Sequence, residues 1–305
     1  CVLLSIEGLH VLDQNIGMEP KEDDFIANLK KIKDWDTPPF FVAVAHHFWN
    51  HLCGHAESLT KLVKKKVDQS EGLNTGFTPL GIRVVKELLS KKNGKQILID
   101  LKHMSVASRK DFYNLIDSTP AYKKLPIIVS HGAVNGLHSF TKKKQIGSKV
   151  ASKLNPVDIN FFNEEIIRIA KSKGIFGLQL DERRIANKDT LKKTKHSINR
   201  SKIMHYRSEL LWNQIQHILE VLDNAGLFAW DCIAIGSDFD GIIDPLNGFW
   251  TTEEMPFLAE FLERHDYNFM SSAGFKVNNN NMDADEIIAR VMSLNGHNFL
   301  KKNYK

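Results

Sequence analysis

The sequence predicts an α/β fold built around a parallel β-sheet. Six short apolar runs rich in β-branched residues recur along the chain, and helical patterns lie between them. Strands that read as continuous hydrophobic runs and alternate with helices are typical of parallel sheets covered on both faces. The predicted strands cover residues 2–7, 41–46, 96–103, 126–131, 175–180 and 232–238.

Helical patterns fill much of the remaining sequence. Thr78 and Pro79 form a helix-start signal, because a threonine cap and a proline in the first turn both favour initiation. Residues 271–282 are polar and predict a loop. Residues 188–206 are polar, basic and helix-poor, and we interpret them as an insertion loop. The predicted helices cover residues 81–90, 108–116, 158–173, 208–222, 251–264 and 283–300.

The composition is that of an ordinary globular protein, since 42% of the 305 residues are hydrophobic and 25% are charged. No apolar run approaches the roughly 18–20 residues that cross a bilayer. The net charge of +5 comes from short lysine runs between apolar segments, and no nucleic-acid-binding module accompanies them. We therefore expect neither a nucleic-acid partner nor a membrane-spanning segment.

The chain begins inside a predicted strand, because Cys1 is followed directly by apolar residues. We therefore expect the natural N-terminus, and any targeting signal, to lie further upstream. The three cysteines are scattered and form no CxxC pair, so they fit neither a disulfide framework nor a structural zinc site. Cysteines without a disulfide framework favour the reducing cytoplasm. A targeting signal upstream would overturn this, so the sequence leaves the compartment open.

Four residues that can bind a metal each end a different predicted strand: Glu7, His103, His131 and Asp238. Both open sheets and closed barrels carry their functional sites at the carboxyl ends of strands. A buried carboxylate or imidazole there must be paired or metal-bound, and two imidazoles with two carboxylates form a donor set that zinc accepts. Taken singly, each histidine also fits a hydrogen-bonded core residue, and Asp240 fits an Asx-turn.

A second histidine-rich segment covers residues 45–55. If it were helical, His47, His51 and His55 would lie on one helix face and could form a second metal cluster. Gly54 favours a loop or a short irregular helix instead, and the segment contains no HExxH motif.

Six motifs resemble those of the membrane-dipeptidase family, the renal-dipeptidase-like metallopeptidases of family M19 among the amidohydrolase-like metallohydrolases. They follow the family's order over nearly the whole chain, which makes the set far more specific than any one motif. The motifs are SIEGLH at residues 5–10, TPLG with RVVKEL at 78–88, LIDLKHMS at 98–105, PIIVSH at 126–131, IGSDFDG at 235–241 and NFL at 298–300.

The resemblance implies a (β/α)₈ TIM barrel with a two-zinc site. It assigns Glu7 as the carboxylate that bridges both ions, His103 and His131 as ligands of one ion, and Asp238 as a ligand facing the other. Asp238 would also carry the proton from the attacking water to the leaving amine, and His46 would polarise the scissile carbonyl. Two metals that share a water molecule can lower its pKa from ~15.7 towards ~7.

Two departures from the family pattern bear on this interpretation. The family's first metal-binding pair, on its first strand, has no counterpart here. Because six strands are predicted and a barrel needs eight, we expect residues 1–305 to form a single barrel domain that lacks its first two β/α units. The family's substrate-binding arginine pair is replaced by Lys153 and Leu154, so Lys153, Arg183 or Arg184 would have to bind the substrate's carboxylate.

We therefore predict a zinc-dependent dipeptidase that hydrolyses the peptide bond of small dipeptides by a metal-activated hydroxide. The altered carboxylate pocket leaves open an amidohydrolase that acts on a non-peptide amide or lactone. The missing first metal pair leaves open a catalytically impaired barrel that serves as a binding protein. The expected partner is a small peptide substrate, and a homodimer is a compatible assembly.

Overall fold

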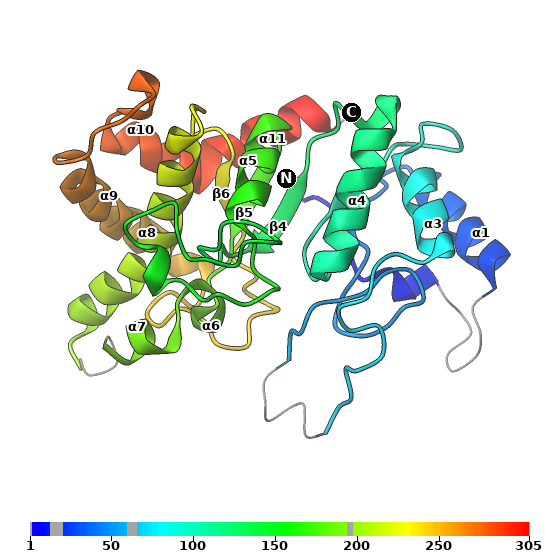
Figure 1. Ribbon diagram of the computed structural model, residues 1–305, viewed down its shortest axis with the longest axis horizontal. Helices are drawn as coiled ribbons and strands as arrows, with labels where there is room; N and C mark the ends of the chain where they lie inside the picture. Colours follow the sequence, from blue (N-terminus) through cyan, green and yellow to red (C-terminus); the bar gives the residue numbers. More distant parts are fainter. Residues whose placement is uncertain (1, 13–20, 60–65, 194–197, 305) are drawn as a thin grey trace. The chain divides into compact units, whose positions relative to one another are not determined.

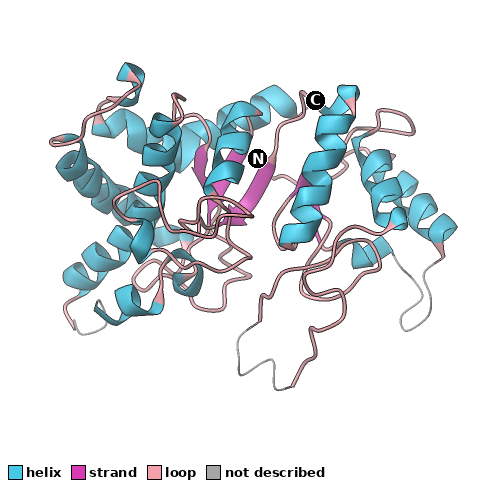
Figure 2. Ribbon diagram, viewed as in Figure 1, coloured by secondary structure: helices cyan, strands magenta, loops and turns pink. Residues whose placement is uncertain are grey.

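The computed structural model describes residues 2–12, 21–59, 66–193 and 198–304. The chain divides into two compact units, Cys1–Ile128 and Val129–Lys305. Figure 2 shows that helices and loops account for most of the chain and that the strands are short. None of the described helices combines the length and the apolar character that a bilayer crossing requires.

In the first unit, strands β1 (Ser5–Glu7), β2 (Phe41–Ala43) and β3 (Leu98–Asp100) pair in parallel in chain order. Ile128, the first residue of β4, pairs in parallel with Asp100 of β3. The helices of this unit are α1 (Glu22–Lys33), α3 (Pro79–Leu89) and α4 (Val106–Ser118), with 3₁₀ turns at Leu9–Leu12 and Pro120–Tyr122, and α3 packs against β3. The predicted parallel arrangement is confirmed for these strands.

Local chemistry explains where the helices of the first unit begin. The Thr78 side chain accepts a hydrogen bond from the Gly81 amide at 3.0 Å, as expected for the predicted start signal, and α3 begins at Pro79, earlier than the predicted bound of residue 81. Helix α4 is capped by Ser105, whose hydroxyl accepts from the Ser108 amide at 3.0 Å, so this helix begins earlier than predicted. Figure 1 shows α1 beside α3, and the two helices are in contact.

In the second unit, β5 (Ile175–Leu178) and β6 (Ile233–Ile235) pair in parallel, and β4 (Ile128–Gly132) opens the unit. The long helix α8 packs against α5 and α9. The helices are α5 (Asn163–Lys171), α6 (Glu182–Ile185), α7 (Lys188–Lys193), α8 (Arg200–Asn224), α9 (Met255–Met270), α10 (Ala284–Ala289) and α11 (Asn295–Asn303). Shorter helical turns lie at Ala151–Lys153, Thr252–Glu254, Asn278–Asn280 and Arg290–Leu294.

The prediction of a helix-poor loop at residues 188–206 is wrong for the described part of that segment. Residues Lys188–Lys193 form α7, and α8 begins at Arg200, where the Asn199 side chain accepts a hydrogen bond from the Lys202 amide at 3.1 Å. The polar and basic sequence reflects the exposure of these helical turns rather than an absence of helix. Residues 194–197 lie outside the described residues.

The α/β class with parallel strand pairing is therefore confirmed. The closed barrel and the single-domain organisation stay predictions, and the two units are described separately below.

Candidate functional site

In the first unit, Glu7, His46 and His103 lie together at the ends of β1, β2 and β3. One donor atom from each of the three side chains lies within 4.8 Å of the other two. His103 Nε2 is 2.9 Å from Glu7 Oε1, and His46 Nε2 is 3.8 Å from Glu7 Oε2. His103 is buried, His46 is half-buried, and the Glu7 side chain is 39% exposed, so solvent reaches the cluster from the Glu7 side.

The backbone after β1 and after β3 has an unusual conformation beside these side chains. Gly8 has φ +89°, and a Cβ at this position would lie 2.8 Å from the Cβ of His46, so only glycine allows this approach. His103 itself has φ +65°, a left-handed conformation that is costly for a non-glycine residue and that is often found at functional sites. The Asp100 side chain stabilises this turn by accepting a hydrogen bond from the Lys102 amide at 3.0 Å.

The loop after β2 is stabilised by a buried asparagine. Asn50 donates to the Val44 carbonyl at 2.6 Å and accepts from the Leu52 and Cys53 amides at 3.1 and 3.4 Å. These bonds fold residues 44–53 into a compact non-helical loop, which fixes the position of His46 at its start.

In the second unit, His131 and Asp238 approach each other from β4 and from the turn after β6. His131 Nε2 is 3.8 Å from Asp238 Oδ2, and the Ser130 hydroxyl is 2.7 Å from His131 Nδ1. Asp238 has φ +61°, so it shares the left-handed conformation of His103 in the other unit. Asp240 is exposed and lies in the turn that Asp238 and Gly241 close, in agreement with the turn predicted for it.

Two glycines allow the strands of the second unit to approach closely beside His131. A Cβ at Gly177 of β5 would lie 2.0 Å from the Ser130 carbonyl oxygen, and one at Gly236 would lie 1.9 Å from the same atom. Because no side chain fits at either position, glycine is required where β4, β5 and β6 converge.

Two of the cations predicted to bind the substrate's carboxylate, Lys153 and Arg183, form ion pairs with acidic residues of the protein. Lys153 Nζ lies 3.2 Å from Glu209 Oε1, and the Arg183 Nε group donates to Asp181 Oδ1 at 3.1 Å. Burial lowers the pKa of Arg184, and this effect is opposed by the neighbouring Asp181. A substrate carboxylate would therefore have to compete with protein carboxylates for these cations.

The helical histidine cluster considered for residues 45–55 does not form. His51 has φ +61° in an irregular loop, and the buried His55 ring lies 3.0 Å from the Glu71 carbonyl and 3.2 Å from the Ala56 carbonyl. His47 contacts the site in a way that the sequence did not predict, because its ring stacks on His46 with a centroid separation of 3.9 Å. The sequence carries one hint of this contact, which is that His46 and His47 are adjacent residues.

Neither buried cysteine can act as a nucleophile at neutral pH. Burial raises the pKa of Cys53, and burial together with the nearby Asp231 raises the pKa of Cys232 to about 12. Thiolate chemistry needs the opposite shift.

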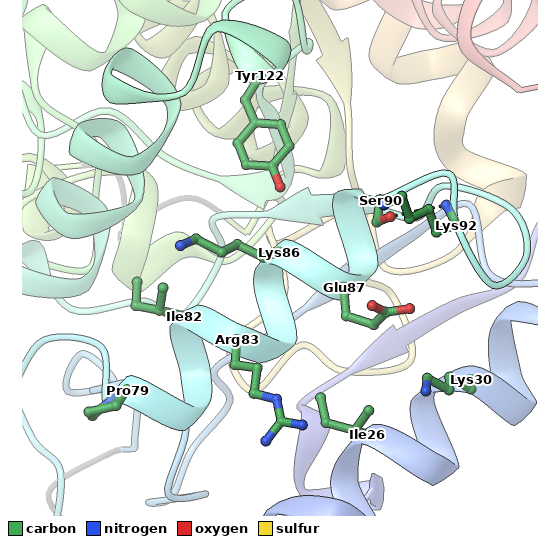
Figure 3. A pocket seen from close by; sticks show the side chains of 10 residues that line it. All are labelled: Ile26, Lys30, Pro79, Ile82, Arg83, Lys86, Glu87, Ser90, Lys92 and Tyr122. Atoms are coloured by element: carbon green, nitrogen blue, oxygen red, sulfur yellow. Dashed lines mark hydrogen bonds between the residues drawn. The ribbon is translucent and has the colours of Figure 1, made fainter.

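The first unit contains a cavity of about 570 Å³. Figure 3 shows its lining side chains, which come from α1, from α3 and the residues just after it, and from Tyr122. Lys30, Lys86 and Lys92 give it cationic groups, and Glu87 gives it a carboxylate. None of its lining residues is a candidate site residue.

The side chains of both groups are of the types that bind metal ions. Glu7, His46 and His103 offer one carboxylate and two imidazoles, a mixture of oxygen and nitrogen donors that zinc accepts. His131 and Asp238 offer the same two donor types in the second unit.

Comparison with known proteins identifies a family. The model of a family described as membrane dipeptidase (peptidase family M19) matches residues 42–281. This range contains His46, His103, His131 and Asp238, whereas Glu7 precedes it.

Solved structures provide a second comparison. A metallo peptidase from Rhodobacter sphaeroides, liganded with a phosphinate mimic of the dipeptide L-Ala-D-Ala, is 18% identical over 76% of this chain and 49% of that chain, with a TM-score of 0.49. The dipeptidase AC, a metallo peptidase of family M19, is 17% identical over 76% of this chain and 51% of that one, with a TM-score of 0.49. The chain thus spans about half the length of these two proteins.

An amidohydrolase from Pseudomonas aeruginosa matches a larger part of the chain. It is 17% identical over 92% of this chain and 68% of that chain, with a TM-score of 0.50. This match supports the α/β fold.

Proposed function

Because the chain belongs to the membrane dipeptidase family, peptidase family M19, we propose that it is a zinc-dependent dipeptidase that hydrolyses the peptide bond of small dipeptides. The family is metal-dependent, and the cluster of Glu7, His46 and His103 is the observation that carries the proposal to this chain. We further propose that the parallel strands belong to a (β/α)₈ barrel, with the site residues at their carboxyl ends.

The proposal gives each candidate residue a role. Glu7 and His103 in the first unit would be zinc ligands, and so would His131 and Asp238 in the second. Bound zinc supplies Lewis acidity towards the scissile carbonyl and lowers the pKa of water. Asp238 would accept a proton from the attacking water and donate it to the leaving amine. His46 would donate a hydrogen bond to the oxygen of the scissile carbonyl as negative charge develops on it.

The experiment that tests the proposal compares Glu7→Gln with wild type in zinc binding and in dipeptide hydrolysis. Glutamine keeps the size of the side chain but removes its charge, so zinc affinity and turnover should both fall. Glu22→Gln is the matched control, since Glu22 is exposed and pairs with Arg83 at 2.9 Å on the surface. Wild-type affinity and turnover in Glu7→Gln would contradict the assignment of Glu7.

His46 requires its own test, because its Nε2 lies near enough to Glu7 to be a ligand as well as a hydrogen-bond donor to the substrate. In the proposed role, His46→Ala keeps its zinc and loses turnover. Loss of zinc in this variant would make His46 a metal ligand instead. His10→Ala is the control, since the exposed His10 ring stacks on His46 only at a centroid separation of 6.5 Å.

A second candidate function follows from the ion pairs of Lys153 and Arg183. With both cations engaged by carboxylates, the chain could hydrolyse amides or lactones that carry no free carboxylate. The deciding comparison is a dipeptide against its C-terminal amide. Equal hydrolysis of the two would favour this second function over a dipeptidase that binds the terminal carboxylate.

A further inference from the structure

The cavity lined by helices α1 and α3 takes no part in the proposed function. Its volume of about 570 Å³ is in the range of small-molecule binding sites. Three lysines are among the side chains that Figure 3 shows around it: Lys30 from α1, Lys86 from α3 and Lys92 from the segment just after α3. Among the described residues that line the cavity, only Glu87 carries a carboxylate. The charge of the lining is therefore mainly positive.

A buried lysine neutralises the groups in the wall that would repel an anion. Lys33 is 1% exposed, and its Nζ lies 3.5 Å from Glu87 Oε1. The same ammonium group donates to the carbonyls of Glu87, Ser90 and Lys92 at 2.6, 2.9 and 3.0 Å, which matches its three hydrogens. The last carbonyls of a helix carry negative partial charge, so this contact removes the repulsion that the end of α3 would exert on an anion.

The loop that carries Lys92 is packed tightly on the end of α1. Gly94 has φ +107°, and a Cβ at this position would lie 2.5 Å from the Lys33 carbonyl oxygen. The Lys92 amide donates to Ser90 Oγ at 3.0 Å. Because these contacts fix the backbone on either side of Lys92, this part of the wall is formed before any ligand binds.

The three lining lysines keep their charge uncompensated. Arg83, the other cation of the lining, pairs with Glu22 at 2.9 Å. In the described part of the chain, no acidic group forms an ion pair with the ammonium groups of Lys30, Lys86 or Lys92. Three positive charges therefore face one concave space.

Tyr122 adds a neutral hydrogen-bond donor to the same cavity. Burial, and after it the nearby Glu87, raises the pKa of Tyr122, so its hydroxyl keeps its hydrogen at neutral pH. Figure 3 shows the ring extending towards α3 with the hydroxyl at its tip. Tyr122 is half-buried, and none of the described residues forms a hydrogen bond with its hydroxyl. A ligand oxygen in the cavity would accept this hydrogen bond.

We propose that this cavity binds a small soluble molecule with at least two phosphate groups, through Lys30, Lys86 and Lys92 and the Tyr122 hydroxyl. Lysine binds phosphate as a point charge, and a phosphate monoester carries a charge of about −1.5 to −2 at pH 7 and three acceptor oxygens. Three ammonium groups therefore match more than one phosphate. The site is independent of the proposed dipeptidase function, since no candidate site residue lines the cavity.

The first test is titration calorimetry of the full chain with fructose 1,6-bisphosphate, a soluble probe with two phosphate groups. The titration is run at an ionic strength of about 0.15 M, where long-range attraction between exposed charges is largely screened. We expect saturable binding of one molecule per chain, and weaker binding of fructose 6-phosphate, which has one phosphate. Absence of saturable binding of the bisphosphate would overturn the proposal.

The second test separates the cavity from general attraction to a basic surface. Lys30→Gln and Lys92→Gln should each weaken binding of the bisphosphate about 5-fold, as expected for one charged contact near solvent. Lys31→Gln and Lys91→Gln are the matched controls, because they remove the same charge from exposed neighbouring residues that do not line the cavity. The controls should bind like wild type. Equal weakening in all four variants would overturn the proposed site.

Tyr122→Phe tests the neutral contact at constant net charge. Loss of the hydroxyl should weaken binding about 3-fold, the effect of one hydrogen bond from a neutral donor. Wild-type affinity in this variant would overturn the role of the hydroxyl.

A lipid headgroup is the other source of phosphate groups. Sedimentation of the chain with phosphatidylcholine vesicles, with and without phosphatidic acid, tests it, and the proposal predicts no binding to either kind of vesicle. Binding to the phosphatidic acid vesicles without binding of the soluble bisphosphate would overturn the assignment to a small molecule.

Discussion

Acid should destabilise the second unit through His217, a histidine of α8 that is fully buried. The ring lies between two polar partners, with Nδ1 2.6 Å from the Ser148 hydroxyl and Nε2 2.7 Å from Asn163 Oδ1. The Asn163 amide nitrogen donates to the Ile146 carbonyl at 2.7 Å, so Oδ1 is the acceptor and His217 Nε2 carries the hydrogen. This arrangement suits a neutral ring, and burial lowers the pKa of His217 to about 3.

The sign and size of the effect follow from linkage. The pKa is near 6.5 in the unfolded chain and about 3 in the folded chain, so the unfolded state takes up the proton first as the pH falls. The stabilisation is therefore complete above pH ~6.5 and is lost as the pH falls towards ~3. At 1.36 kcal/mol per pKa unit, the whole shift amounts to about 5 kcal/mol, of which about 2 kcal/mol is lost between pH 7 and pH 5.

Urea unfolding of wild type and His217→Gln at pH 7 and pH 5 measures this loss. The variant should be less stable than wild type at pH 7, because it replaces a hydrogen-bonded ring, but its stability should fall by about 2 kcal/mol less on going to pH 5. His138→Gln, at an exposed position, is the control and should follow wild type. Identical pH dependence in wild type and His217→Gln would refute the reasoning.

Three further predictions concern other buried or paired charges. Burial and Glu263 raise the pKa of Asp266 to about 7. The stability contributed by the protonated carboxyl is therefore full below pH ~3.8 and is lost as the pH rises through ~7. In urea unfolding, the free energy of unfolding of wild type should fall by about 2 kcal/mol more than that of Asp266→Asn between pH 5 and pH 7. Arg183→Ala leaves the buried Asp181 without its guanidinium and should cost about 1–3 kcal/mol, against less than about 1 kcal/mol for the exposed pair in Lys153→Ala; equal thermal shifts would contradict this. Asp238→Asn should keep the fold and lower kcat by ~10²–10⁴-fold, whereas Asp240→Asn should affect kcat much less, and exchanged phenotypes would refute the assignment.

The sequence predicted the strands and the strand-end residues because both depend on local patterns. Each of the six apolar runs overlaps an observed strand. Strand β3, whose three residues are all buried, shows the reason, since a strand buried on both faces needs an uninterrupted hydrophobic run. Glu7, His103 and Asp238 could be singled out because polar residues directly after such a run are costly unless they have a partner.

Helices whose signals lie in charge rather than in apolar periodicity were harder to predict. Helix α1 has three acidic residues in its first turn and lysines in its last, an arrangement that favours the helix dipole, but its apolar positions are few. Lys33 at its end is buried, and it donates to three carbonyls at the end of α3 and just after it, among them that of Glu87 at 2.6 Å. A lysine in this environment is indistinguishable from a surface lysine in the sequence.

Contacts between distant parts of the chain could not be predicted. Gln69 donates a hydrogen bond to the His47 carbonyl, although 22 residues separate the two in the sequence and no period or motif relates them. The ion pairs of Lys153 and Arg183 could not be predicted either. Lys153 pairs with Glu209, which comes from the distant helix α8. Arg183 pairs with Asp181, which is near in the sequence, but sequence proximity alone does not show that the two side chains meet.

The central claim is that the chain is a zinc-dependent dipeptidase, and zinc content measured together with dipeptide hydrolysis tests it most directly. The account predicts that the full chain binds zinc in a fixed ratio, that a chelator removes zinc and hydrolysis together, and that added zinc restores both. Hydrolysis that continues unchanged after zinc is removed would contradict the account. So would a zinc-loaded, folded chain that cleaves no dipeptide.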